Sequence, residues 1–414
     1  MAAQPAAEAK VFLHIGEPKT GTTFIQQVMW SNRAELAAQG VVLPGHHPQD
    51  HFRASQDLRG IEKLPTDPAG SWTGEWEILA SQAQQAGKTA VISHELFSAA
   101  DDAQAGRAVR SLQPAEVHVV LTVRDIATLL PAEWQETVKH RNTRAWEDWL
   151  GDVIDRESVS ADRRQWWFWR VHDTVAILRL WAAHVPPERI HVITTAPRGS
   201  ATGLLWERFA SVIGIDPGSV DLGRARPNAS LGMAETEFLR RLNQALPGPG
   251  EVPDWFYMWN VKETVAHRAL AGRAPGARLV LPAARDAWAK EQSETLIAGL
   301  RDSAYDIVGD LDDLRPPQVT EPAASPSDQP AGQLLDAAVQ ATAALVVNQY
   351  RREYPPARPQ EPRSRGLAGR VESAIAASPR LKRTVREFSG RYPAVRRLRV
   401  LAWRALERTR TRGH

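Results

Sequence analysis

The residues best suited to chemistry stand together near the start of the chain, in the segment HIGEPKTGTT at 14–23. An apolar run precedes this segment and a helical pattern begins near Phe24, so the segment joins a strand to a helix. Gly16 and Gly21 permit a tight backbone path, and Lys19 adds a mobile positive charge. Backbone N–H groups at a helix N-terminus attract anions. The segment therefore predicts a phosphate-binding loop.

Three threonines, at positions 20, 22 and 23, complete the donors of this loop. Their hydroxyls can donate to an anion or cap the following helix. The ordinary phosphate loop of ATPases and kinases reads GxxxxGK[ST], with the lysine after the second glycine. Here Lys19 precedes Gly21, so a phosphate-loop kinase needs a displaced lysine. A strand-to-helix turn that binds no ligand is the other alternative. It does not explain why so many hydrogen-bond donors, the threonine hydroxyls and the Lys19 ammonium among them, gather in one short loop.

The order PKTGTT behind a strand resembles the 5′-phosphosulfate loop of sulfotransferases that use 3′-phosphoadenosine 5′-phosphosulfate (PAPS). This resemblance implies that the loop binds the 5′-phosphosulfate through Lys19, Thr20, Gly21, Thr22 and Thr23. It implies a catalytic role for Lys19 at the leaving oxygen, and it requires no metal ion. The implied fold is the sulfotransferase variant of the phosphate-loop NTPase fold, a three-layer α/β/α structure with a central parallel sheet and a mostly helical C-terminal part.

The segment VRDIATLLPAEW at 123–134 is similar to the 3′-phosphate motif of the same family, an arginine at a strand end followed eight residues later by a serine. Arg124 matches, and its guanidinium suits a phosphate because it offers paired donors. Position 132 is alanine, so one hydrogen bond of the motif is missing. Gln135 and Lys139 lie further along the same predicted helix and are candidates to replace it. An ion pair of Arg124 with an acidic side chain at the sheet edge is the structural alternative.

The segment from Arg226 to Asn243 resembles the stretch that closes over the nucleotide in bacterial members of the family, and AYDIVGDLDDL at 304–314 also resembles them. The resemblance implies contacts of Asn228 and Ser230 with the 3′-phosphate or the adenosine. Ser230 suits the cap of the following helix equally well. Both interpretations of Ser230 stay open.

Sulfuryl transfer also needs a general base within hydrogen-bond reach of the acceptor. The apolar strand predicted at Thr89–Ser93 ends in His94 and Glu95, beside the predicted phosphate loop. Related sulfotransferases place a base after this strand, so the resemblance implies a catalytic role for Glu95, with His94 as the second candidate. Adjacent residues of a strand point to opposite faces, which leaves the choice open. Capping or salt bridging is the structural alternative.

Strands that alternate with helices must position these groups. Apolar runs predict strands at Val11–Gly16, Val41–Leu43, Thr89–Ser93, Val117–Val123 and Arg189–Thr195. The alternation implies a parallel sheet with right-handed crossovers, and ligands of such sheets lie beyond the carboxyl ends of the strands. Helices are predicted at 234–246, 262–273 and 284–300. Two further segments are ambiguous. The segment HHPQDHFR at 46–53 offers histidines and an aspartate but matches no standard zinc-ligand spacing, so we expect a loop there. The segment QWWFWR at 165–170 predicts either part of the core or an aromatic platform for an acceptor.

The 414 residues include no cysteine, which excludes disulfides, thiolate metal sites and a catalytic thiol. The first residues lack a basic segment followed by an apolar one, and we expect a cytoplasmic protein. We expect a sulfotransferase-like domain over 10–315, a linker over 316–333, a helix over 334–354 and a basic tail over 355–414. From 357 onward, 16 lysines and arginines face four glutamates, a net charge of +12, which leaves −9 for residues 1–356.

The tail pattern at 392–408 is that of a basic amphipathic helix. Its candidate partners are an anionic membrane surface and the acidic body of the same protein, and nothing in it reads nucleic-acid bases. The resemblance as a whole implies transfer of a sulfuryl group from PAPS to a hydroxyl or amine of a small-molecule, glycan or lipid acceptor. A phosphate-loop kinase and a nucleotide-binding scaffold without activity are the alternatives.

Overall fold

The computed structural model describes residues 9–62, 71–155, 167–197, 199–201, 203–225, 230–271, 273, 278–317 and 325–354. The described strands form one sheet with the order β2-β3-β1-β4-β5-β6. Their bounds are β1 Lys10–Gly16, β2 Val41–Val42, β3 Thr89–Ser93, β4 Glu116–Val123, β5 Ile190–Thr194 and β6 Asp306–Val308. Every pair of neighbours is parallel, which confirms the predicted parallel sheet. The edge strand β6 lies within 304–314 and was not among the predicted strands.

The α-helices have the bounds α1 Thr22–Ser31, α2 Arg33–Ala38, α3 Pro48–Leu58, α4 Glu75–Gln85, α5 Asp102–Leu112, α6 Ile126–Lys139, α7 Trp146–Ile154, α8 Trp167–His172, α9 Thr174–Ala182, α10 Leu204–Ile213, α11 Met233–Ala245, α12 Asp254–Tyr257, α13 Asp286–Arg301 and α14 Ala331–Glu353. Short 3₁₀ turns are η1 Glu95–Ala99, η3 Pro187–Arg189, η4 Pro217–Ser219, η5 Leu222–Arg224, η7 Ala283–Arg285, η8 Leu311–Leu314 and η9 Pro326–Asp328. The segment η6, Met258–Leu270, is a π-helix.

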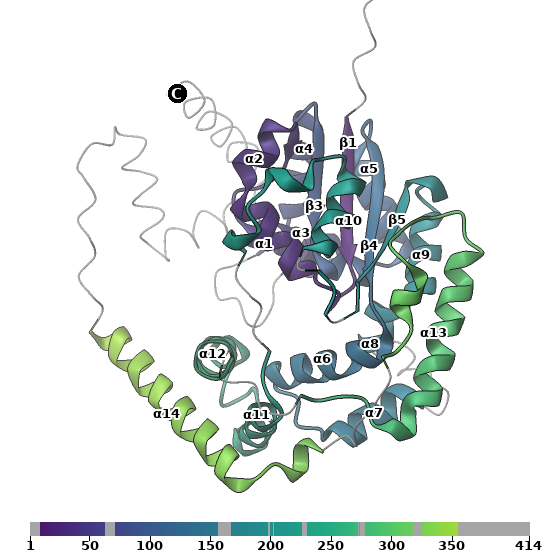
Figure 1. Ribbon diagram of the computed structural model, residues 1–414. Coiled ribbons are helices and arrows are strands. Elements are labelled where there is room, and N and C mark those ends of the chain that lie inside the picture. Colours follow the sequence, from purple (N-terminus) through teal and green to yellow (C-terminus); the bar gives the residue numbers. More distant parts are fainter. Residues whose placement is uncertain are drawn as a thin grey trace, which may run out of the picture.

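Alternate side chains of the central strands enter two apolar cores, one on each face of the sheet. Val11 and Leu13 of β1 pack with α4, α5 and α9 on one face. Phe12 packs with α1 and α10 on the other. β4 is buried almost throughout, as a parallel strand covered on both sides must be. These two cores confirm the predicted three-layer α/β/α arrangement, which Figure 1 shows from the side of α10.

A third apolar cluster joins the helices beyond the carboxyl ends of the strands. It contains side chains of α6, α7, α8, α11, α12, η6, α13 and α14, with Trp134 and Tyr257 among the largest. Figure 1 shows α6, α7 and α11 below the sheet, with α14 along the outer side of this layer. The helical C-terminal part is therefore confirmed. This helical layer covers the edge of the sheet where the predicted ligand residues lie.

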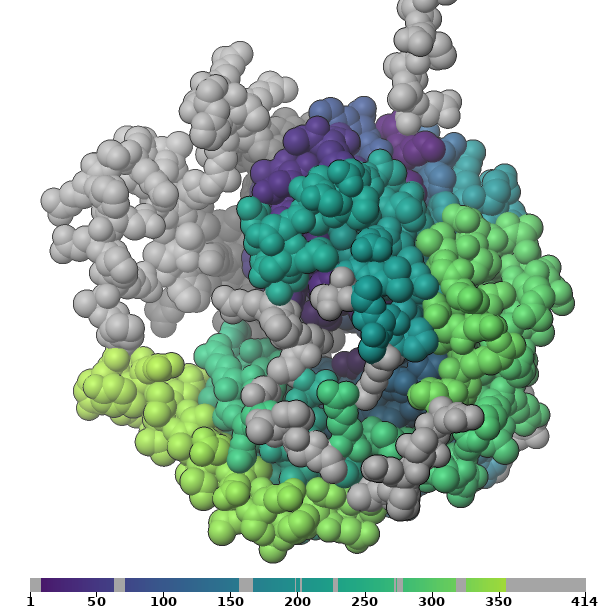
Figure 2. Space-filling model, viewed as in Figure 1, coloured from purple at the N-terminus to yellow at the C-terminus, as the bar shows by residue number. Residues whose placement is uncertain are grey.

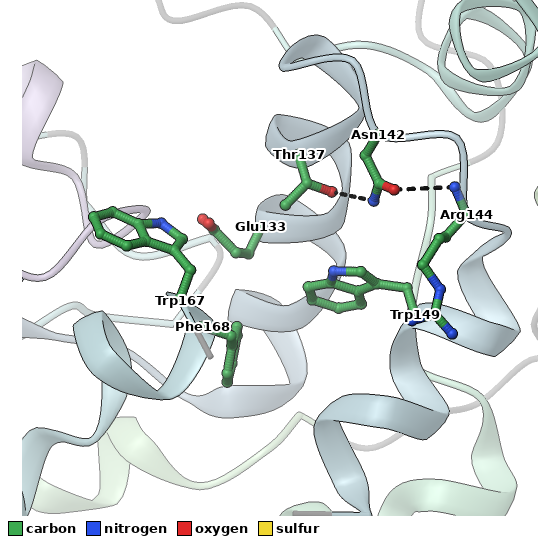
Figure 3. Close-up of a pocket in the computed structure, with 7 residues that line it drawn as sticks. All are labelled: Glu133, Thr137, Asn142, Arg144, Trp149, Trp167 and Phe168. Carbon is green, nitrogen blue, oxygen red and sulfur yellow. Dashed lines mark hydrogen bonds between the residues drawn. The ribbon is translucent and has the colours of Figure 1, made fainter. Parts of the chain in front are cut away.

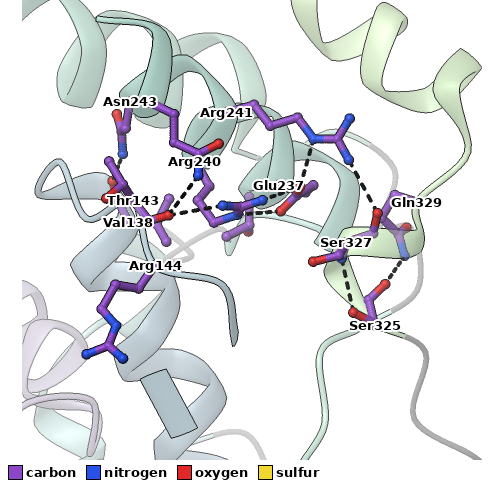
Figure 4. A network of polar contacts seen from close by, with 12 residues as sticks. Val138, Thr143, Arg144, Glu237, Arg240, Arg241, Asn243, Ser325, Ser327 and Gln329 are labelled. Atoms are coloured by element: carbon purple, nitrogen blue, oxygen red, sulfur yellow. Dashed lines mark hydrogen bonds and ion pairs between the residues drawn. The ribbon is translucent and has the colours of Figure 1, made fainter. Parts of the chain in front are cut away.

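Ion pairs to one buried carboxylate hold α11 within this helical layer. The carboxylate of Glu237 accepts two bonds of 2.8 Å from Arg240 and one of 2.7 Å from Arg241. Arg240 also donates to the backbone oxygen of Thr143, and Arg241 to that of Ser327 in η9. Figure 4 shows how this network links α11 to the loop after α6 and to the segment before α14. The Glu237 side chain is fully buried, so its two arginine partners are needed to balance its charge.

One predicted element was wrong in type. The segment 46–53 was expected to be a loop, but Pro48–Leu58 is helix α3. His47 caps this helix by accepting a bond from the Gln49 backbone, and Pro48 stands at the first helical position, where its missing N–H costs nothing. The helix predicted from 262 is confirmed as helical, and it belongs to the π-helix η6. Among the described helices, none is both long enough and apolar enough to cross a membrane. The predicted tail at 355–414 lies outside the described residues.

Candidate active site

The predicted phosphate loop, as we call it from here on, connects β1 to α1 at the centre of the sheet. Its backbone turns through left-handed conformations at Gly16, Lys19 and Gly21, with φ values of 113°, 62° and 94°. The backbone N–H of Glu17 donates to the Thr122 oxygen of β4 at 2.8 Å. Gly21 is the N-cap of α1, and within the described residues no side chain caps this helix. The first N–H groups of α1 thus face the loop without a side-chain acceptor, as an anion site requires.

The predicted threonine donors of the loop divide into two kinds. The Thr20 hydroxyl is buried and donates to the Glu17 backbone oxygen at 2.5 Å, and it lies 2.6 Å from the Thr122 hydroxyl. Its side chain therefore holds the loop in shape. Thr22 is also buried, whereas Thr23 is half-buried at the start of α1. The backbone oxygen of Thr20 accepts a bond from Thr195, beyond β5.

Lys19 and Arg124, predicted as separate anchors, lie together. The Arg124 guanidinium donates to the Lys19 backbone oxygen at 3.2 Å. The Lys19 ammonium extends to α6 and donates to the Glu136 carboxylate at 2.5 Å. Burial opposes the charge on Lys19, but Glu136 and other nearby carboxylates outweigh it and raise the pKa of this lysine. A positive group is thus held ionised at the mouth of the loop.

Glu136 is the centre of this arrangement and was not among the predicted site residues. Besides Lys19, it contacts Lys139 at 2.6 Å, Lys262 at 3.0 Å and His140 at 3.2 Å. Burial opposes its charge, yet the lysines hold its pKa well below the ordinary value. Sequence reasoning missed it because Lys262 comes from η6, far along the chain. The spacing of Glu136 and Lys139 on one predicted helix was the available signal.

Gln135 and Lys139 were the candidates to replace the serine missing at position 132. Gln135 donates to the Leu231 backbone oxygen at 3.1 Å and to the Thr236 hydroxyl at 3.2 Å, so its amide is held by the start of α11. Lys139 is held by Glu136. Both side chains therefore have protein partners in this structure, and the replacement stays a prediction.

His94 and Glu95 follow β3 and begin η1, beside the phosphate loop. The ring of His94 caps η1, because its Nδ1 accepts a bond of 3.2 Å from the Leu96 backbone. The Glu95 carboxylate accepts a bond of 3.1 Å from Gln26 of α1. Burial lowers the pKa of His94. Burial opposes the charge on Glu95, but His94, the Gln26 bond and Lys19 outweigh it and lower the pKa of this carboxyl. The carboxylate is therefore ionised and turned toward α1.

The remaining predicted ligands belong to the segment before α11. Asn228 lies outside the described residues. Ser230 is exposed, and α11 begins at Met233 with Gly232 as its N-cap. The alternative that Ser230 caps this helix is therefore wrong. Its predicted contact with the nucleotide stays a prediction.

A buried triad below the loop was also absent from the predicted residues. The His172 ring of α8 lies 3.5 Å from the Glu17 carboxylate and 3.7 Å from that of Glu133 on α6. Thr174 donates to Glu17 at 2.5 Å. Burial disfavours the imidazolium, but the two carboxylates outweigh it and raise the pKa of His172 to about 9. The triad ties the phosphate loop to α6 and α8. Its members come from three segments that are distant in the sequence, so no local sequence pattern predicts the triad.

A cavity of about 220 Å³ lies beside this triad (Figure 3). It is lined by Glu133, Thr137, Asn142, Arg144, Trp149, Trp167 and Phe168. The aromatic segment predicted as core or platform divides between the two roles: Phe168 is buried, whereas the Trp167 side chain is exposed at the cavity. Figure 2 shows the surface hollowed between α10 and the helices below it. Trp166 and Gln165 lie outside the described residues.

Comparison with known proteins gives one similarity. No protein-family model matches the chain, and no curated protein sequence matches it. Among solved structures, a sulfotransferase from Alicyclobacillus acidocaldarius is similar with 15% sequence identity, over 63% of this chain and 96% of that chain. The TM-score is 0.33, too low for this similarity to support a function. The functional proposal below therefore depends on the residues of the site.

Proposed function

We propose that the protein is a PAPS-dependent sulfotransferase that transfers the sulfuryl group to a hydroxyl or amine of its acceptor. The observation that carries this proposal is the loop between β1 and α1. It combines the PKTGTT order with left-handed turns at Lys19 and Gly21, and within the described part of the chain the α1 N-terminus has no side-chain cap. These features suit an anion that is held by backbone N–H groups and one ammonium.

The residues fit both charged ends of the nucleotide. Backbone N–H groups from position 20 to 23 and the Thr23 hydroxyl would hold the 5′-phosphosulfate. Arg124, which touches the loop at the Lys19 oxygen, would bind the 3′-phosphate with its forked donors. Asn228 and Ser230 would complete that end. Lys19 and Arg124 supply fixed positive charge, so this assignment needs no metal ion.

The chain's own residues then account for each step of an in-line displacement. The acceptor oxygen or nitrogen attacks sulfur while the bond between sulfur and the bridging phosphate oxygen breaks. Lys19 neutralises the negative charge that builds on the bridging oxygen. Glu95 is ionised and accepts the acceptor's proton. His94 is the second candidate, although its Nδ1 is already engaged as a cap. The products are the sulfated acceptor and 3′-phosphoadenosine 5′-phosphate (PAP).

The test is calorimetric titration of the full chain with PAP and, separately, with ATP and magnesium. Metal-free binding of PAP that weakens at least tenfold in both Lys19→Ala and Arg124→Ala is the expected result. Lys88→Ala is the matched control, because Lys88 is an exposed lysine at the opposite, amino end of β3. Preference for magnesium-ATP would favour the phosphate-loop kinase. PAP binding without sulfuryl transfer to any acceptor would favour the scaffold.

A further inference from the structure

The π-helix η6 places positive groups opposite the end of α6. The Lys262 ammonium donates to Glu136 across 126 residues of sequence, at 3.0 Å. In a π-helix the backbone bonds join residues five apart, which favours the same side of the helix for Lys262 and His267, and the charge of Lys262 acts on the His267 ring. In an α-helix the same two residues would point in different directions. Lengthy π-helices are rare, and π turns occur frequently at functional sites.

Three lysines from three segments converge on one carboxylate. Lys19 and Lys139 both contact the Oε2 atom of Glu136, so their ammonium groups lie side by side. Lys262 contacts Oε1 and lies 2.5 Å from the ring of His140. Other carboxylates act on the cluster from further away, namely Glu95 and Glu133 on Lys19, and Glu263 on His267. Lys139 and Lys262 have no carboxylate within contact distance, among the described residues, except the one they share.

This positive surplus is largely withdrawn from water. The side chains of Lys139 and Lys262 are 17% and 15% exposed, and that of His140 is 49% exposed, which leaves the cluster open on one side. Burial is the main cause that lowers the pKa of Lys139. The charges of Lys19 and Lys262 lower this pKa further, and Glu136 raises it by less than these effects together. Burial and then Lys139 likewise lower the pKa of His267. Partly buried charges that lack balance are costly and favour the arrival of an anion.

On the basis of the proposed function, we propose that Lys139 and Lys262 bind an anionic group of the acceptor, and that Glu136 occupies this position until the acceptor arrives. Lys19 marks the sulfuryl end of the donor, and Lys139 is its neighbour on the same oxygen atom. The anionic group therefore lies next to the hydroxyl or amine that receives the sulfuryl group. The substrate class is an acceptor with a carboxylate, sulfate ester or phosphate ester close to the reacting atom.

The experiment uses inorganic sulfate as the probe on the full chain saturated with PAP, with affinity measured by calorimetry. We expect Lys139→Gln and Lys262→Gln to weaken sulfate binding at least tenfold, and Lys262→Gln to leave PAP affinity within twofold. Lys88→Gln is the control and should change neither affinity. Glu136→Gln removes the internal competitor and should strengthen sulfate binding at least fivefold. A damaged fold cannot produce that increase, so this variant separates the proposal from simple loss of structure.

The outcomes distinguish this proposal from the proposed function. Sulfate affinity that is unchanged in both lysine variants, or weakened in Glu136→Gln, overturns the anion subsite. A loss of PAP affinity in Lys262→Gln as large as that in Lys19→Ala assigns Lys262 to the donor and also overturns it. If the wild-type chain does not bind PAP, the sulfotransferase proposal fails. If sulfate binding still depends on Lys139 and Lys262 in that case, the two lysines bind an anion that is not part of a sulfuryl acceptor, and the acceptor assignment fails as well.

Discussion

The ammonium of Lys19 lies 2.5 Å from the carboxylate of Glu136, 117 residues further along the chain. This pair joins the predicted phosphate loop to helix α6, which lies in the helical layer beyond the carboxyl ends of the strands. Because Lys139 and Lys262 converge on the same carboxylate, Glu136 is a structural centre and, in the proposed anion subsite, the group that an incoming anion displaces. Its two roles have separate experimental consequences.

Glu136→Gln should lower the free energy of unfolding by about 2–3 kcal/mol, because it leaves three lysines without their shared partner. The comparison is Glu35→Gln, which removes an exposed surface pair with Arg224 and should cost far less stability. The pKa of Glu136 is lowered on folding, so its contribution is present at neutral pH and is lost as the pH falls through its folded value. Urea unfolding at pH 7, and at a series of pH values below 4.5, measures both effects. Equal losses in the two variants would contradict the central role of Glu136.

The triad of His172, Glu17 and Glu133 predicts a loss of stability in alkali. The pKa of His172 is raised to about 9 by folding, from an ordinary value of 6.5. Its contribution is therefore complete below pH 6.5 and is lost as the pH rises through about 9, an effect of about 3 kcal/mol. Urea unfolding between pH 6 and 9.5 should show this decline in the wild type and not in His172→Gln. NMR titration of the His172 ring reads the pKa directly, and a value near 6.5 would contradict the prediction.

Gly16 should be intolerant of a side chain. Its φ is 113°, and a Cβ atom there would lie 2.9 Å from the Glu95 backbone oxygen. Gly40 also has a positive φ, 83°, but a Cβ atom there would meet nothing within 4 Å. Gly16→Ala should therefore destabilise the chain by about 2 kcal/mol more than Gly40→Ala, and should push Glu95 away from the loop. Urea unfolding of both variants tests this. Equal losses in the free energy of unfolding would show that η1 moves to make room for the new methyl group.

The assignment of the base predicts a difference between two adjacent residues. Glu95→Gln should leave PAP affinity nearly unchanged and lower the rate of sulfuryl transfer by about 10²- to 10⁴-fold, because the proton loses its acceptor. His94→Gln should have a smaller effect on the rate, because the His94 ring serves η1 through its Nδ1 atom. The measurement is PAP release from PAPS with an acceptor found by screening. The opposite order of effects would make His94 the base.

Local sequence was sufficient for five of the six described strands and for the placement of Lys19 and Arg124 at one edge of the sheet. The apolar runs of β1, β3 and β4 are strong because these strands are buried on both faces, and the predicted bounds differ from the observed ones by at most one residue. Parallel strands bring their carboxyl ends to one edge, so the phosphate loop, Glu95 and Arg124 had to lie near one another. The helix α3 was missed because its cap is an uncommon one, a histidine ring ahead of a proline.

The sequence by itself determined the loop that we propose to bind an anion, because hydrogen-bond donors and glycines five residues apart act within one turn of backbone. Only the tertiary structure decided which charges surround that loop. Glu136, Lys262 and His172 reach the site from three separate elements, and their ionisation depends on burial and on one another. Such coupling arises from packing over long sequence separations, where no periodic pattern records which side chains will meet.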